Sequence, residues 1–121
     1  MRKLLFIMLT CILFIGCNET DYSGIDPQLN IKEYTFPKEG GTLDLYSKLG
    51  YPLWAESNLG VEVTEDETSL TGSWYKVTYE NKNKNLHIEV QPNETGVERK
   101  LPFTIVSDDF RCKTNYIQKA N

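Results

Sequence analysis

Apolar and polar residues alternate in short segments along most of the chain. The segment Thr42–Ser47 is the clearest example, because Leu43 and Leu45 fall on one side of an extended chain and Tyr46 falls on the other. Similar segments recur about every ten residues, and none has a helical period. We expect strands within Leu29–Phe36, Thr42–Ser47, Leu53–Ser57, Val61–Glu65, Trp74–Tyr79, Leu86–Gln91, Leu101–Ser107 and Arg111–Gln118.

Residues that favour turns separate these segments. Gly50 and Pro52 interrupt the chain after the second segment. The stretch Asp66–Ser73 is polar and contains Gly72, and Glu80–Asn85 is interpreted as a solvated turn. Strands with one apolar side must bury that side against a second layer. We therefore predict an all-β fold, an immunoglobulin-like antiparallel β-sandwich of about seven to eight short strands.

The same pattern predicts which aromatic side chains form the core. We expect Trp54 to be buried, because tryptophan is mostly found in protein interiors. In the last strand, Tyr116 lies on the same side of the chain as Cys112 and Thr114. In the segment 74–79, Trp74 lies opposite Tyr75, so one of these two side chains must face solvent.

Residues 1–17, MRKLLFIMLTCILFIGC, have the order of a secretory signal. Arg2 and Lys3 precede an apolar run that is shorter than the roughly 20 residues of a membrane span. The small Gly16 followed by Cys17 resembles the lipobox of bacterial lipoproteins, in which the signal peptidase cuts before a cysteine that carries diacylglycerol. Two alternatives stay open: an ordinary signal peptide that is cut elsewhere, and a retained N-terminal anchor.

The lipobox resemblance divides the chain into three parts. Residues 1–16 are the expected lipoprotein signal peptide, residues 17–28 a lipidated tether, and residues 29–121 the folded domain. The acylated Cys17 is the expected site of attachment to the membrane. No Asp follows this cysteine to suggest retention in the inner membrane, so we expect the protein to be anchored in the bacterial outer membrane.

Charge and cysteine content narrow the functional classes. The 121 residues carry a net charge of −4, which argues against a nucleic-acid partner, and we expect a monomer. Glu19 and Asp21 resemble the acidic stretch that sends Bacteroidetes lipoproteins to the cell surface. With Cys11 removed and Cys17 acylated, Cys112 has no partner for a disulfide and is expected to be a buried, inert thiol.

A series of landmark residues covers nearly the whole domain. In chain order these are Gly40, Gly41, Trp54, Trp74, Asn93, Arg99 and Gln118. Their order resembles the BACON domain, an immunoglobulin-like module of secreted Bacteroidetes proteins. The long segment between the two tryptophans departs from that pattern, as does the polar turn ENKNKN. The resemblance implies a core position for Tyr116. It also implies a carbohydrate-related role, often beside glycan-degrading domains.

The sequence offers little catalytic chemistry. His87 is the sole histidine, so neither a metal site nor a catalytic triad is expected. Glu62, Glu65, Asp66 and Glu67 surround one turn, and we interpret them as a solvated surface rather than a glycosidase pair or a Ca²⁺ site. We therefore predict no enzymatic activity, no cofactor and no metal.

Exposed aromatic side chains are the remaining candidates for binding. Sugar rings stack their C–H edges on flat aromatic faces, and Tyr46, Tyr51 and Trp74 are the candidate stacking residues. The expected partner is a polysaccharide or the glycan of a glycoprotein at the bacterial surface. The alternative is a spacer or a protein-interaction module, either an edge-strand partner or an inhibitor, with no affinity for glycans.

Overall fold

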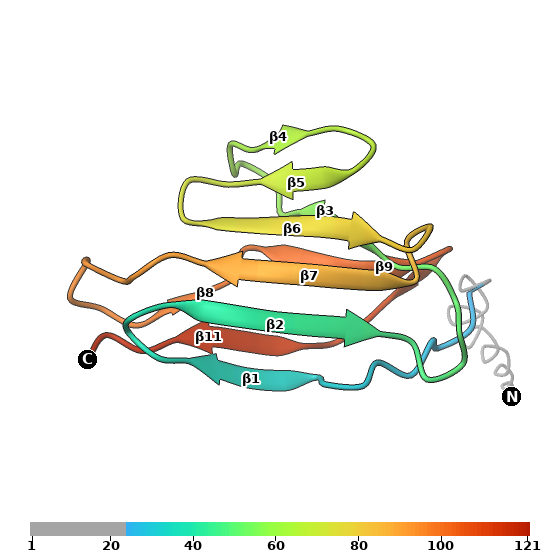
Figure 1. Ribbon diagram of the computed structural model, residues 1–121, viewed down its shortest axis with the longest axis horizontal. Helices are drawn as coiled ribbons and strands as arrows, with labels where there is room; N and C mark the ends of the chain where they lie inside the picture. The colour runs from blue at the N-terminus through green and yellow to red at the C-terminus, as the bar shows by residue number, and fades with distance from the viewer. Residues whose placement is uncertain (1–23) are drawn as a thin grey trace, which may run out of the picture.

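The computed structural model describes residues 24–121, which form an all-β sandwich (Figure 1). The expected signal peptide and Cys17 lie outside these residues. No helix occurs between residues 24 and 121. The strands are β1 (Glu33–Phe36), β2 (Gly41–Tyr46), β3 (Trp54–Ser57), β4 (Thr64–Glu65), β5 (Ser69–Thr71), β6 (Tyr75–Glu80), β7 (Asn85–Val90), β8 (Arg99–Lys100), β9 (Phe103–Ser107), β10 (Phe110–Arg111) and β11 (Asn115–Gln118).

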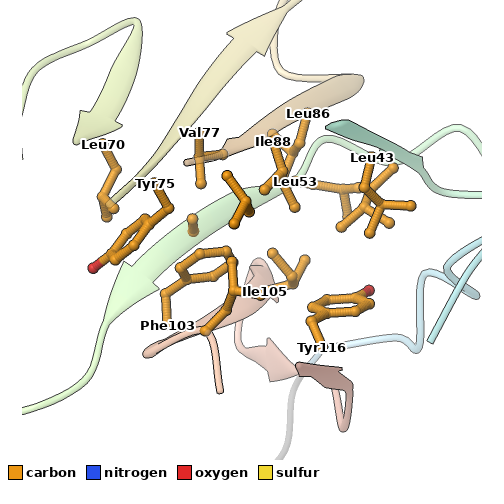
Figure 2. Packing of buried hydrophobic residues seen from close by; sticks show 14 of the residues in the cluster. Leu43, Leu53, Leu70, Tyr75, Val77, Leu86, Ile88, Phe103, Ile105 and Tyr116 are labelled. Carbon is orange, nitrogen blue, oxygen red and sulfur yellow. The ribbon is translucent and has the colours of Figure 1, made fainter. Parts of the chain in front are cut away.

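The strands form three sheets around one core. The five-stranded sheet has the order β2-β7-β6-β5-β4 and is antiparallel throughout. The two three-stranded sheets, β1-β11-β8 and β10-β9-β3, pack on the core from the other side (Figures 1 and 2). Buried side chains from both layers fill the space between them, which confirms the predicted sandwich.

The core follows the predicted alternation closely. Leu43 and Leu45 point inward from β2, and Leu86 and Ile88 meet them from β7 in direct register. Tyr116 is buried on β11, the position that the BACON resemblance implies (Figure 2). Because the longer strands β2, β6, β7 and β9 bury residues at alternate positions, short strands are enough to close a continuous core.

The two ends of the sandwich carry different features. β2 ends at Tyr46 and β6 ends at Glu80, and both residues pair with Asn85 at the start of β7. The described chain begins at this same end, which lies on the right in Figure 1. We call it the proximal end, and we call the opposite end, where the C terminus lies, the distal end.

Two features of the sheets differ from the prediction. The pairing of β1 with β11 is parallel, so the sandwich is not wholly antiparallel. The polar segment 66–73, in which no strand was expected, contains β5, whose Leu70 is fully buried. A single apolar residue between two polar neighbours gave no detectable alternation, so the sequence pattern missed this strand.

Four residues behind the BACON resemblance, Gly40, Trp74, Arg99 and Gln118, have structural roles at the distal end. Gly40 has φ +93° and lies where a Cβ would come within 2.3 Å of the Val90 carbonyl oxygen, so only glycine fits. The guanidinium of Arg99 lies 3.8 Å from the centre of the Trp74 ring. Arg99 Nε also donates to the buried side-chain oxygen of Gln118 at 2.9 Å.

Candidate functional site

A pocket of about 170 Å³ lies at one corner of the proximal end. We call it the corner pocket. It is lined by Ile25, Tyr51, Pro52, Trp54, Ser107 and Asp108. Drug-sized ligands usually occupy about 300 to 1,000 Å³. The corner pocket therefore suits a single ring-sized group, with the rest of a larger ligand outside.

Two strands and their loops fix the walls of the pocket. Trp54 opens β3 and pairs with Val106 of β9. Ser107, at the end of β9, donates from its hydroxyl to the Pro52 carbonyl at 2.9 Å and thereby holds the loop that carries Tyr51. Because this hydroxyl is buried, the loop is attached at a fixed point of the sheet.

A negative charge lies beside the aromatic side chains. Asp108 is exposed in the turn between β9 and β10, with a left-handed φ of 55° that Asp tolerates better than most residues. Its carboxylate can accept hydrogen bonds from hydroxyl groups, while the rings of Tyr51 and Trp54 offer apolar contact. This combination matches a ligand with apolar C–H edges and several hydroxyls.

The structure separates the three candidate stacking residues. Tyr51 lines the corner pocket. Tyr46 is 48% exposed at the end of β2, on the outer surface of the five-stranded sheet. Trp74 immediately precedes β6 at the distal end. It is half-buried between Arg99 and Tyr75, and the centre of its ring lies 5.1 Å from that of Tyr75 in an edge-to-face arrangement.

The prediction that Trp54 is buried was wrong. Its side chain is 43% exposed and lines the corner pocket. The signal was present in the sequence, because Glu56 follows two residues later in the same strand and must face solvent. Leu53 and Ala55 are the buried residues of this segment, so the alternation places Trp54 outside.

His87 forms a polar cluster on the outer surface of the five-stranded sheet. Its Nδ1 lies 2.7 Å from Asp44 Oδ1, and its Nε2 lies 3.5 Å from Glu89 Oε2. The hydrogen bond to Asp44 raises the pKa of the imidazole above its ordinary value, with smaller contributions from the charges of Asp44, Glu89 and Glu80. Among residues 24–121, no group of three or more His, Cys, Asp or Glu side chains could hold a metal ion.

The acidic turn is built around Asp66. All four carboxylates, Glu62, Glu65, Asp66 and Glu67, are exposed. Asp66 Oδ1 accepts hydrogen bonds from the backbone of Thr68 and Ser69, both at 2.8 Å, and these bonds lower the pKa of its carboxyl group. The Asp66 side chain therefore stabilises the turn that connects β4 and β5.

Cys112 is a free, buried cysteine. Burial, with a smaller effect of the Asp26 charge, raises the pKa of its thiol to about 11. A thiol with such a pKa stays protonated at neutral pH and is a poor nucleophile.

Comparisons with known proteins inform the fold alone. A scan against protein-family models finds no match, and neither does a search of curated proteins. The chain is similar to a protein from Bacteroides thetaiotaomicron solved by NMR, with a TM-score of 0.58 and 19% identity. The match covers 83% of this chain and 86% of that one. Within the described residues, no helix has the length and apolar character to cross a membrane.

Proposed function

We propose that the chain is a lipoprotein of the bacterial outer membrane whose domain binds a glycan without catalysis. The acylated Cys17 is the proposed anchor, on the lipobox ending of residues 1–17. The observation that carries the proposal for the domain is the corner pocket, which combines Tyr51 and Trp54 with the carboxylate of Asp108. In this proposal Tyr51 stays a binding residue, and Trp54 replaces Tyr46 and Trp74.

The edges of β2 and β3 are poor sites for an edge-strand partner. The side chain of Asn30 accepts from the Tyr46 backbone N–H at 2.8 Å and donates to the Asp44 carbonyl at 3.1 Å. On β3, the hydroxyl of Tyr79 contacts both the backbone N–H and the carbonyl of Ala55, at 3.3 and 3.1 Å. These edges already have hydrogen-bond partners, so a further strand gains little by pairing there.

A glycan array probed with the purified full-length protein tests the binding role. We expect binding to a restricted set of saccharides, with Trp54→Ala and Tyr51→Ala weakening it at least about tenfold through loss of ring contact. Tyr46→Ala is the matched control and should bind as the unmodified protein does. Absence of binding across a broad array would favour the spacer or protein-interaction module.

The anchor is tested separately. Mass spectrometry of the mature protein should find Cys17 as an acylated N-terminal residue, and Cys17→Ala should leave the membrane fraction. An unmodified N terminus elsewhere in the chain would contradict the lipoprotein assignment and leave the pocket unaffected.

A further inference from the structure

The corner pocket opens beside the start of the described chain. Ile25 lines it, and a Cβ on Gly24 would come within 2.5 Å of the Phe110 backbone nitrogen. Pro27 is fully buried, and its carbonyl accepts a hydrogen bond from the hydroxyl of Ser47. The first described residues are therefore packed against the domain next to the pocket.

The length of chain between this point and the proposed anchor is short. Gly24 lies seven residues beyond Cys17. Seven fully extended residues span at most about 25 Å. This step rests on the proposed lipidation of Cys17, which then keeps the proximal end and its pocket close to the membrane interface.

Exposed apolar side chains gather at the same end. Of the seven large hydrophobic residues that are exposed in residues 24–121, four lie there: Ile25, Tyr46, Leu49 and Trp54. Ile25 is 63% exposed and Leu49 is 47% exposed. Leu49 lies in the turn after β2, where its backbone N–H donates to the Ser47 hydroxyl at 3.0 Å. Tyr and Trp favour the boundary between lipid and water, because one part of the ring is apolar and the other is polar.

The proximal end carries exposed charges of both signs. Exposed Lys48, Lys82 and Lys84 lie there together with exposed Asp26 and Asp108. Contact with a membrane would therefore depend on apolar burial and change little with ionic strength.

We infer that the ligand of the corner pocket is the sugar headgroup of a membrane glycolipid. The proximal end rests on the lipid surface through its exposed apolar side chains. Trp54 and Tyr51 contact the headgroup sugar, and Asp108 accepts its hydroxyls. A pocket for one ring fits a single headgroup sugar better than a long polysaccharide, whose repeated rings need an extended groove.

The two tryptophans provide a matched test, since they lie at opposite ends of the sandwich. The lipidated full-length protein is placed in phosphatidylcholine vesicles that contain increasing amounts of glucosyl, galactosyl or mannosyl diacylglycerol. Trp74→Phe leaves Trp54 as the fluorescent reporter of the pocket. Trp54→Phe alters the pocket itself and leaves Trp74 to report any response at the distal end. We expect a saturable change in Trp54 emission with at least one glycolipid, no change in Trp74 emission, and little effect of salt.

Two further arms separate this inference from the proposed function. The matching methyl glycoside, added in solution at the same total concentration, should give a response at least about tenfold weaker. A Gly-Ser spacer inserted after Tyr22 should weaken the glycolipid response but leave glycoside binding unchanged. Equal responses to both sugar forms, unaffected by the spacer, would overturn the glycolipid assignment while the saccharide pocket stands. A response to none of the three glycolipids in a protein that binds saccharides on the array would overturn it as well.

Discussion

Single polar side chains at buried positions join strands that are far apart in sequence. Gln118 is fully buried, and its Nε2 donates to the carbonyls of Pro37, Lys38 and Gln91 at 2.9 to 3.3 Å. Its Oε1 accepts from Arg99. One amide therefore joins several segments, and an apolar replacement would remove all of these hydrogen bonds at a buried position.

We expect Gln118→Leu to lower the free energy of unfolding by about 1 to 3 kcal/mol, because it removes the hydrogen bonds that a fully buried amide makes to several segments. Chemical denaturation followed by circular dichroism measures this change. Gln91→Leu replaces an exposed side chain of the same type and should change the stability by less than about 0.5 kcal/mol. Similar losses in both variants would show that the network around Gln118 contributes little.

His87 gives the domain a small dependence on pH. Its hydrogen bond to Asp44 raises the imidazole pKa in the folded state above the unfolded value of about 6.5. The resulting stabilisation is complete below pH 6.5 and is lost as the pH rises through the folded-state pKa. Because the pair is largely exposed, we expect an effect below about 1 kcal/mol.

Asp44→Asn should lower the pKa of His87 toward its ordinary value, because the main stabilising partner of the imidazolium is removed. An NMR titration of the imidazole ring measures the shift. Glu89→Gln should produce a smaller decrease, since that carboxylate lies 3.5 Å from the ring rather than 2.7 Å. A His87 pKa unchanged in Asp44→Asn would contradict the contact.

At the scale of elements, two tyrosine hydroxyl groups on β6 differ in their hydrogen bonding. Tyr79 OH bonds the backbone of Ala55 and covers the edge of β3. Tyr75 OH is buried and has no hydrogen-bond partner among the described residues. The two residues lie on the same strand, so they form a matched pair for testing how the edge is stabilised.

We expect Tyr79→Phe to destabilise the domain by about 1 to 2 kcal/mol and to increase self-association through the uncovered edge. Tyr75→Phe removes an unpaired buried hydroxyl and should leave stability unchanged or raise it. Thermal unfolding and size-exclusion chromatography provide the two readouts. A larger loss in Tyr75→Phe than in Tyr79→Phe would contradict the hydrogen-bond assignments.

At the scale of the whole molecule, the alternation in the sequence predicts the sandwich and most of its core. The alternation could not predict the parallel pairing of β1 with β11, because this pairing joins the first and last strands of the chain, which are far apart in sequence. It also could not predict the corner pocket. Ile25, Trp54 and Asp108 are brought together only by the folded chain, and no local pattern links them.

The corner pocket is proposed to bind a sugar ring. The most direct test of this proposal is an NMR titration of the protein with the saccharide that binds most tightly on the array. We predict saturable shifts of the Trp54 indole N–H and of the Asp108 backbone amide, while the Trp74 indole N–H stays in place. Shifts that instead centre on Trp74 or on Tyr46, with Trp54 unmoved, would contradict the account.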